Sequence, residues 1–397
     1  MWQVLDSFTM SDYLLSVMAT SSHLRRINQR KIVHSMLRLH CSASRTKLAE
    51  IAGMSQATVG RIVDDLITQS ILAEVDAADY PASSDSPQLG RPSRLLELDR
   101  ARPRMLLIHL GVRQTRLAAV AVAIPETDQW RVEFNTPRSK SEWFAKLARA
   151  CRNLPLRGID AVIMSCPGVV DEPSGRVLLC PNIHWAEQAN FTSGIRSITR
   201  SPVVFLQEIR ALALGQLAIE PNLKDFLLVD FGDGVGGASI VGAKLETGHL
   251  PLSGELGHTP VLGNDRKCGC GSIGCTETLV SRTGLLKSFY DNTGLRTWTA
   301  LVSHLEKNGL SDWFRSSLDA VAITVAGALN VEGIANVVFT GFFSELPGVA
   351  SNYLCSKVRR HAMWSRLGEV RATIAPRHRM AGMICAGIDR VLLAVPE

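Results

Sequence analysis

Apolar residues near the start of the chain recur at the spacing of amphipathic helices. Between residues 28 and 39 they fall at positions 32, 33, 36 and 37, which form one face of a helix. Ser44 and Ser55 each precede another helical pattern, so we expect them to cap helices over residues 46–52 and 56–69. Gly53 ends the first of these two helices in a tight turn. Helices joined in this way are typical of a helix-turn-helix.

Two short strand patterns follow these helices. Residues 71–75 and 94–98 are rich in apolar side chains, and a polar segment with several Pro and Ser residues separates them at 76–92. A hairpin after a helix-turn-helix forms a wing, so the sequence predicts a winged helix-turn-helix with its linker over residues 23–100. Residues 1–22 show no clear period, and we expect an N-terminal arm there.

From residue 101 to residue 397 the pattern becomes that of an α/β domain. Apolar runs predict buried strands over residues 106–111, 117–123, 161–169, 203–208, 227–232 and 336–341. Helical spacing predicts helices over residues 143–152 and 318–329. This alternation predicts a mixed sheet with helices on its faces. We expect the basic tract 357–379 to be mainly solvated helix and loop surface.

The charge of the chain is unevenly placed. The 397 residues are enough for two or three domains, and their formal net charge is +6. Residues 21–61 alone contain eight Lys or Arg and one acid. A basic segment on an otherwise balanced protein indicates a polyanion partner such as DNA. A solvated helix face explains the same charges equally well.

The helix over residues 56–69 is the candidate reading helix. Glutamine can pair with adenine, arginine with guanine, and alanine or threonine can touch a thymine methyl group. Basic side chains before this helix would meet phosphates, and an arginine in the extended segment 89–93 can enter a narrow minor groove. The candidate DNA contacts are Arg45, Lys47, Ser55, Gln56, Ala57, Thr58, Arg61 and Arg91. A helical module for dimerisation or protein binding, and a plain linker at 89–93, are the alternatives.

A glycine-rich loop carries one histidine and three cysteines: His258, Cys268, Cys270 and Cys275. One imidazole and three thiolates form a complete tetrahedral set for structural zinc, with no position left for water. Four unrelated side chains in one loop are the alternative. The nine cysteines are an odd number, which argues against a disulfide scaffold and for a reducing cytoplasm.

The segments GELGH at 254–258 and CGCGSIGCTE at 268–277 resemble the signature of the ROK family, which contains bacterial sugar kinases and sugar-responsive repressors. The resemblance implies a two-lobed actin-like ATPase fold, the sugar-kinase fold of this family, with zinc in the second lobe. It also implies that glutamates in both segments bind sugar hydroxyls. The Asn-Asp pair of the family aligns with Gln207-Glu208. The implied ligand residues are Gln207, Glu208, Glu255, His258 and Glu277.

The chain departs from the kinase motifs of this family at four places. The metal-directing aspartate of the first phosphate hairpin is His109, and the second phosphate loop carries Asp233 where a hydroxyl is usual. A carboxylate there repels phosphate. The adenosine-side Gly-Gly pair is Thr340-Gly341, and the catalytic base would be Glu208, one methylene longer than aspartate. We therefore expect no ATP-dependent phosphoryl transfer.

The sequence thus predicts an α/β protein, with an N-terminal winged helix-turn-helix followed by an actin-like domain, that acts as a transcriptional repressor. Its partners would be operator DNA and a sugar or sugar derivative, and it would form a homodimer or a dimer of dimers. An active sugar kinase with an added DNA-binding domain, and a regulator controlled by a protein partner at the zinc lobe, are the alternatives. No membrane span or secretory signal is expected, because the longest uncharged run, 320–331, is too short and the N-terminus lacks a basic region.

Overall fold

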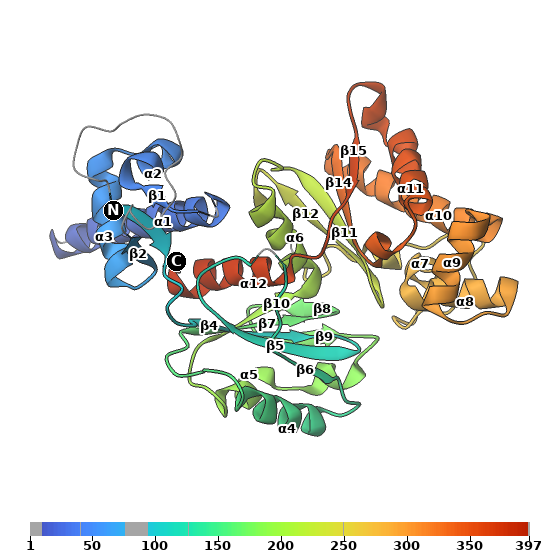
Figure 1. The fold of residues 1–397 in the computed structure, drawn as a ribbon, viewed down its shortest axis with the longest axis horizontal. Coiled ribbons are helices and arrows are strands. Elements are labelled where there is room, and N and C mark those ends of the chain that lie inside the picture. The colour runs from blue at the N-terminus through green and yellow to red at the C-terminus, as the bar shows by residue number, and fades with distance from the viewer. Residues whose placement is uncertain (1–9, 40, 76–93, 126, 249, 396–397) are drawn as a thin grey trace, which may run out of the picture.

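The computed structural model describes residues 10–39, 41–75, 94–125, 127–248 and 250–395. These residues form an N-terminal unit, drawn in blue in Figure 1, and two lobes that each contain a five-stranded sheet. The helix α12 (Arg379–Gly387) lies between the N-terminal unit and the lobes.

Three helices of the N-terminal unit are α1 (Met10–Leu39), α2 (Arg45–Ala52) and α3 (Gln56–Thr68). The predicted caps are confirmed, because the Ser44 and Ser55 side chains accept hydrogen bonds from the backbone N–H groups of Lys47 and Thr58. Gly53 ends α2 with a φ of 62°, which is the left-handed conformation that glycine tolerates best. The predicted apolar faces of α1 and α3 are buried.

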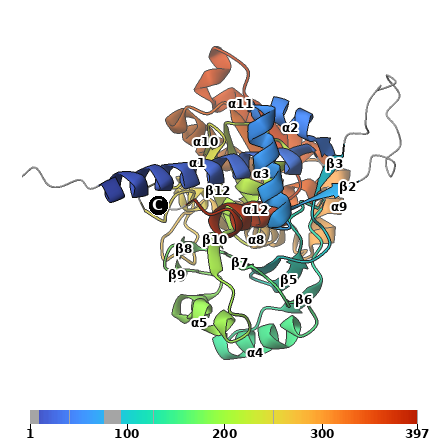
Figure 2. The ribbon, with the colours of Figure 1, turned by 90° about the vertical axis from the view of Figure 1, so that its left-hand side faces the viewer.

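Helix α1 is longer than the sequence pattern predicts, and this corrects the expectation of an arm over residues 1–22. The helix begins at Met10 and runs across the molecule as one long rod (Figure 2). The segment Met10–Leu39 contains neither glycine nor proline, so nothing in it interrupts the propagation of a helix that has formed. The prediction relied on the apolar period of residues 28–39 and therefore found only that part.

A three-stranded antiparallel sheet in the order β1-β3-β2 completes the N-terminal unit. The two predicted strands are confirmed as β2 (Leu72–Val75) and β3 (Leu95–Leu98). A further strand, β1 (Ala43–Ser44), pairs with β3 and was not predicted, because two residues are too few to show an alternation. The predicted tip at 76–92, including Arg91, lies outside the described residues.

The first lobe is built on a mixed sheet in the order β10-β7-β4-β5-β6. Its strands are β4 (Met105–Leu110), β5 (Gln114–Val120), β6 (Val132–Asn135), β7 (Ala161–Cys166) and β10 (Val203–Gln207). Strand β4 runs parallel to β7 and antiparallel to β5. Helix α12 packs on one face of this sheet, and the opposite face is covered by α4 (Lys140–Cys151) and α5 (Phe191–Arg196). A hairpin beside it consists of β8 (Val169–Asp171) and β9 (Arg176–Leu179).

The second lobe has a sheet in the order β13-β12-β11-β14-β15. Its strands are β11 (Phe226–Phe231), β12 (Val235–Val241), β13 (Lys244–Leu245), β14 (Asn336–Gly341) and β15 (Arg371–Ile374). One face packs against α6 (Glu208–Ile219), and the other against α10 (Asp312–Glu332) and α11 (Gly348–His361). Three further helices lie at the end of this lobe: α7 (Glu277–Val280), α8 (Arg282–Thr293) and α9 (Trp298–Asn308).

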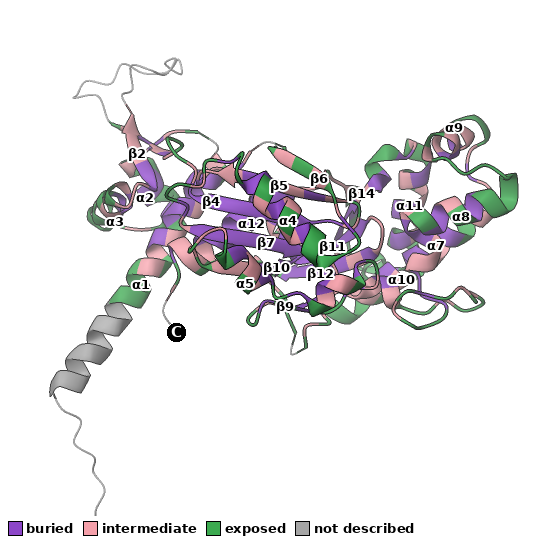
Figure 3. Cartoon of the chain, turned by 90° about the horizontal axis from the view of Figure 1, so that it is seen from below, coloured by how far each residue is buried: buried purple, intermediate pink, exposed green. Residues whose placement is uncertain are grey.

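Every strand that the sequence predicts in the α/β region is present, and the central strands β4, β7 and β11 are buried along their whole length (Figure 3). The core does not stop at the predicted boundary at residue 100. Apolar side chains of α1, α3, β4 and α12 form one continuous cluster. None of the described helices combines the length and the apolar character that crossing a bilayer requires.

Candidate ligand cleft and metal centre

A polar cleft of about 510 Å³ lies where turns of the two lobes face each other. The turn after β4 and the start of α6 line it, together with the turn after β11 and the loop that follows β13. All five predicted ligand residues line this cleft: Gln207, Glu208, Glu255, His258 and Glu277. The structure therefore brings these side chains together, and their binding role stays a prediction.

Gln207 and Glu255 contact each other in the cleft. Gln207 ends β10, and its Nε2 donates a 3.0 Å hydrogen bond to Glu255 Oε1. Glu255 precedes the short helix η3 (Leu256–His258), and its Oε2 lies 3.6 Å from His258 Nε2. Burial raises the pKa of the Glu255 carboxyl, while His258 and Gln207 act against that rise. The group thus offers an amide, a carboxylate and an imidazole to a ligand.

Glu172 positions the end of β10. Its Oε1 accepts a 3.0 Å hydrogen bond from the backbone N–H of Gln207 and lies 3.3 Å from Arg210 Nη1. Its Oε2 accepts a 2.8 Å hydrogen bond from Arg390. The Glu172 and Arg210 side chains are almost fully buried. The sequence analysis missed Glu172, because it lies in the turn between β8 and β9 with no motif around it.

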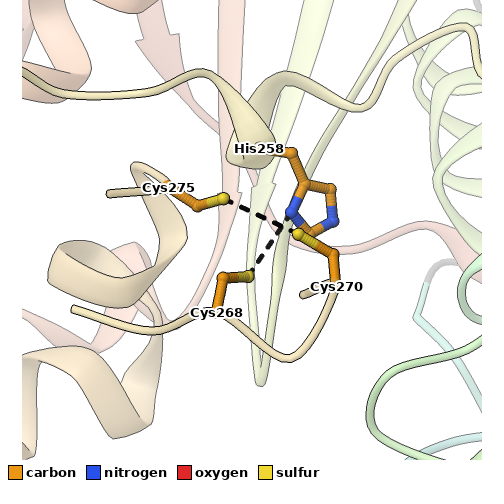
Figure 4. A group of neighbouring side chains, drawn as sticks. All are labelled: His258, Cys268, Cys270 and Cys275. Atoms are coloured by element: carbon orange, nitrogen blue, oxygen red, sulfur yellow. Dashed lines mark hydrogen bonds between the residues drawn. The ribbon is translucent and has the colours of Figure 1, made fainter. Parts of the chain in front are cut away.

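The four predicted metal ligands meet at one point (Figure 4), and their ligand atoms all lie within 4.8 Å of one another. His258 Nδ1 is 3.6 Å from Cys268 Sγ, and the sulfurs of Cys270 and Cys275 are 3.7 Å apart. Metal–sulfur bonds of about 2.3 Å in a tetrahedron place two sulfurs roughly 3.8 Å apart, whereas a disulfide needs about 2 Å. Burial tends to raise the pKa of the Cys270 thiol, but hydrogen bonds with Ser272 and the neighbouring cysteines lower it to about 7. These residues therefore fit a closed metal site with nitrogen and sulfur ligands.

Glu277 and His258 belong to both the metal centre and the cleft. The Cys268 thiol donates a 3.0 Å hydrogen bond to Glu277 Oε1, and the Val235 backbone N–H donates one of 3.4 Å to Glu277 Oε2. His258 turns Nδ1 toward the thiols and Nε2 toward Glu255. A metal bound to Nδ1 would fix the ring and leave the Nε2–H group as a donor in the cleft.

His109 and Glu208 also line the cleft. His109 is buried on β4, and its Nε2 is 3.7 Å from Glu208 Oε1. Burial lowers the pKa of His109 well below its usual value, and the charges of Arg379 and Arg116 lower it further, so the ring is neutral at physiological pH. Arg379, the first residue of α12, donates a hydrogen bond to the same Glu208 oxygen. Glu208 is thus held by a guanidinium.

Arg377 occupies the space beside the glycine turns. Its guanidinium donates hydrogen bonds of 2.7 and 2.9 Å to the two oxygens of Asp230, and one of 3.0 Å to the Phe231 carbonyl. A Cβ atom on Gly232 would lie 3.0 Å from Arg377 Nη2, and one on Gly341 would lie 2.9 Å from it. Burial acts to lower the pKa of Arg377, but Asp230 raises it by more, so the guanidinium stays charged.

Asp233 also has an arginine partner, which the sequence analysis did not anticipate. Arg113 Nε donates a 2.9 Å hydrogen bond to Asp233 Oδ1, and Arg113 Nη2 lies 2.7 Å from the same oxygen. The carboxylate therefore sits in the turn between β11 and β12 as half of an ion pair. Thr340, the fourth predicted departure from the kinase motifs, is buried within β14 and is not among the described residues that line the cleft.

The basic tract 357–379 is not entirely the solvated surface that the sequence predicts. Its last two arginines, Arg377 and Arg379, line the cleft, and Arg379 is only 4% exposed. Both follow strand β15, which is parallel to β14. Ligand sites in α/β proteins gather at the carboxyl ends of parallel strands. The position of these two arginines after such a strand could have indicated their place in the cleft, whereas the charge count of the tract could not.

Most of the predicted DNA contacts form an exposed surface on the N-terminal unit. Along the start of α3 the exposed residues are Ser55, Gln56, Ala57, Thr58 and Arg61. Lys47 is exposed and pairs with Glu50 at 2.9 Å. Arg45 contacts both Asp64 at 2.8 Å and Glu74 at 2.9 Å, so two carboxylates already neutralise it. The role of these residues toward DNA stays a prediction.

The chain is similar to proteins of known family and structure. The sequence profile of the ROK family matches residues 107–387. A xylose repressor from Bacillus subtilis (strain 168) is 24% identical over 361 residues, which cover 88% of this chain and 91% of that protein. A crystal structure of a ROK family transcriptional regulator, described as a homolog of E.coli MLC protein, matches with a TM-score of 0.69 and 17% identity, over 92% of this chain and 96% of that one.

The two lobes by themselves match a sugar kinase. The ROK hexokinase from Thermus thermophilus superposes with a TM-score of 0.59 and 20% identity, over 72% of this chain and 96% of that one. The similarity shows that the two lobes have the actin-like sugar-kinase fold. Because the family profile spans most of the chain and both lobes have the fold of its kinases, this chain belongs to the ROK family.

Proposed function

We propose that this chain is a DNA-binding transcriptional repressor whose kinase-like lobes sense a sugar or sugar derivative. The N-terminal unit acts as a winged helix-turn-helix, in which α3 enters the major groove. One observation carries the proposal: the same chain contains the exposed start of α3 and a cleft with the Gln207–Glu255 pair. The name of the Bacillus subtilis relative, a xylose repressor that aligns over nearly the whole chain, supports it.

The cleft suits a ligand with several hydroxyl groups. Gln207, Glu255, Glu277 and the Nε2 of His258 offer both donors and acceptors to it. A site built on hydrogen bonds rejects ligands that lack a partner hydroxyl, because its buried polar groups are then left unpaired. Pentoses, beginning with D-xylose, are the first candidates, and hexoses, amino sugars and sugar phosphates follow.

Phosphoryl transfer from ATP is lost in this proposal. A kinase needs room for phosphate groups and a free carboxylate that accepts the proton of the sugar hydroxyl. Here Arg377 fills the space beside Gly232 and Gly341, and Arg379 holds Glu208. His109 puts a neutral ring in the place of the metal-directing carboxylate. The likeness to the ROK hexokinase favours the alternative, an active sugar kinase with an added DNA-binding domain.

The metal centre would hold zinc in a structural role. Three sulfurs and one imidazole nitrogen are a ligand set that suits zinc and leaves no coordination position for water. When bound, the ion would tie together the loop that carries Glu255 and Glu277, so it would shape the cleft without taking part in a reaction.

Titration of DNA with the purified full-length protein tests the proposal. Fluorescence anisotropy with DNA from upstream of its own gene should show binding to a two-fold symmetric site, as expected for a homodimer or a dimer of dimers. One sugar of the panel should change that affinity. Glu255→Ala should abolish the sugar response and leave the sugar-free DNA affinity within about twofold. Glu345→Ala, which removes a cleft carboxylate outside the predicted sugar set, is the control.

Two other outcomes would select the alternatives. Magnesium-dependent ATP turnover on the sugar panel, abolished by Glu208→Gln, would establish a kinase. If no sugar binds, and Glu255→Ala leaves regulation in cells intact, control by a protein partner at the zinc-bearing lobe takes the place of sugar sensing.

A further inference from the structure

Helix α12 connects the cleft with the N-terminal unit, and we propose that it transmits ligand occupancy from the cleft to the DNA-binding helices. This inference rests on the proposed function and adds the route of its regulation. The helix continues directly into a π-helical turn, η6 (Ile388–Leu392), so Arg379 and Asp389 are about 15 Å apart along the axis. Figures 1 and 2 both place α12 between α1 and the sheet of the first lobe.

The first turn of α12 is bound to the cleft. Arg379 donates a hydrogen bond to Glu208, and the next backbone N–H, that of Met380, donates a 2.9 Å hydrogen bond to Asp128. Arg379 Nη1 also lies 3.8 Å from Asp128. A ligand hydroxyl that binds Glu208 would compete with Arg379 for the same carboxylate. Occupancy of the cleft therefore changes the interactions of the first residue of α12.

The middle of α12 is packed too closely to bend. A Cβ atom on Gly382 would lie 1.8 Å from the carbonyl oxygen of Ala211 on α6, and one on Gly215 would lie 1.8 Å from the carbonyl oxygen of His378. A Cβ atom on Gly387 would lie 2.4 Å from a methionine sulfur of β4. All nine residues of the helix are buried. A displacement at one end of such a close-packed element reaches the other end, because there is no free volume to absorb it.

The far end of the helix is bound to α1. His34 Nε2 lies 2.8 Å from Asp389 Oδ1. Arg30 donates hydrogen bonds to the backbone carbonyls of Asp389 and Leu393, the latter at 2.7 Å. Side chains of α12 and α1 also belong to one apolar cluster, which continues into α3. A shift of Asp389 therefore shifts the helix on which α2 and α3 pack.

A second contact joins the far end of α12 back to the cleft. Arg390, the residue after Asp389, binds Glu172, and Glu172 accepts the backbone N–H of Gln207. A separate joint, between the end of α3 and the first lobe, contains no cleft residue. There Arg104 contacts Asp160 and donates to carbonyls at the end of α3. This joint supplies a control.

Hydrogen exchange of the full-length protein, measured without sugar or DNA, tests the route. Glu208→Gln weakens the hold on Arg379, and we expect exchange in residues 28–39 of α1 to rise by about fivefold or more along with that of α12. Glu345→Gln removes another cleft carboxylate, one that pairs with Arg282 instead of α12, and should leave α1 unchanged. The proposal would be overturned if exchange rises in α12 but stays unchanged in α1. It would also be overturned if exchange in strand β11 rises as much as in α1, because that would indicate general destabilisation.

The reciprocal change tests the same coupling, because linkage acts equally in both directions. Asp389→Asn should raise exchange at residues 379–383, at the cleft end of α12. Asp160→Asn loosens the joint that bypasses the cleft and should not do so. Neither measurement needs a ligand. If both exchange results appear but no sugar binds, the route through α12 stands and the proposal of sugar sensing fails. If sugar and DNA bind but neither exchange result appears, the proposed function stands and the route through α12 is overturned.

Discussion

Arg113 and Asp233 form an ion pair between the two lobes, with Arg113 Nη2 2.7 Å from Asp233 Oδ1. Arg113 lies in the turn between β4 and β5, and Asp233 in the turn between β11 and β12. Arg113 is 58% exposed, so the pair adds little to the stability of the fold, about 0–1 kcal/mol. Its position matters more than its energy, because it joins a turn of the first lobe to a turn of the second lobe.

Reversing one charge of this pair should favour an open cleft. Arg113→Asp replaces the attraction with repulsion between two carboxylates, and at this exposed position the repulsion is about 1 kcal/mol or less and is strongest at low salt. Small-angle X-ray scattering at low salt should therefore give a larger radius of gyration for this variant. Adding Asp233→Arg restores opposite charges and should restore the wild-type value. If the double variant stays as open as the single one, the pair does not set the lobe position.

Loss of one thiol should release the metal. Cys268→Ser removes a sulfur that lies 3.6 Å from His258 Nδ1, and a closed four-ligand site has no spare ligand to replace it. We expect less than one metal equivalent per chain by elemental analysis, and a loss of roughly 4 kcal/mol or more in the stability of the second lobe. Cys41→Ser, which changes an exposed cysteine far from the cluster in sequence, is the control. A native protein that contains no metal would contradict the assignment.

The contact between α1 and η6 should weaken as the pH rises. Burial alone would lower the pKa of His34, but hydrogen bonds with Asp389 and Cys385 raise it to about 10 from the ordinary 6.5. Arg30 is the other charged group at this contact. Because the folded pKa is the higher one, the stabilisation is complete below pH 6.5 and is lost as the pH rises toward 10.

Chemical unfolding across this pH range checks the sign. The free energy of unfolding of the wild type should exceed that of His34→Gln by most near pH 6.5, and the difference should shrink steadily up to pH 10. A difference that grows with pH would mean that His34 is neutral in the folded protein and that its bond to Asp389 is an uncharged one.

Among the described elements, the central strands of both lobes and the helices α1, α2, α3, α4 and α10 could be predicted, α1 only in part, because their signals are local. All six residues of β11 are buried and all but Asp230 are apolar, and Ser44 and Ser55 stand next to the helices that they cap. The metal ligands were predicted for the same reason, since His258 and Cys275 lie in one loop. The error at α1 has another cause, because Met10, Tyr13, Leu14, Val17 and Met18 recur at helical spacing and the sequence analysis overlooked them.

The ion pairs of the cleft could not be predicted in this way. Arg377 and Asp230 are 147 residues apart in the sequence, and Arg379 and Glu208 are 171 apart. An arginine in a basic tract looks the same in the sequence whether water or a carboxylate surrounds it. Only the fold brings the residues that follow β15 to Asp230 on β11 and to Glu208 at the start of α6, and the partner of each charge follows from that.

Removal of one arginine from α3 should weaken DNA binding. Arg61 is exposed on the helix that we propose to read the major groove. If it contacts a base, Arg61→Ala costs about 1–3 kcal/mol and relaxes specificity at one position, whereas Lys47→Ala weakens binding to all sequences and lowers the salt slope by about 1. Binding measured at several salt concentrations separates these effects. Equal losses on specific and random DNA for Arg61→Ala would assign it to a phosphate.

Two glycine-to-alanine substitutions should have opposite effects on stability. Gly327 lies exposed in the middle of α10 with no atom within 4 Å of an added Cβ, so Gly327→Ala should stabilise the protein by about 0.5–1 kcal/mol. Gly382 lies in α12, where the same methyl group would meet the Ala211 carbonyl oxygen at 1.8 Å, and overpacking of this kind costs about 1–3 kcal/mol or more. Thermal unfolding of the two variants measures both signs. A stable Gly382→Ala protein would show that α12 and α6 can separate, and the close packing on which the proposed transmission depends would then be absent.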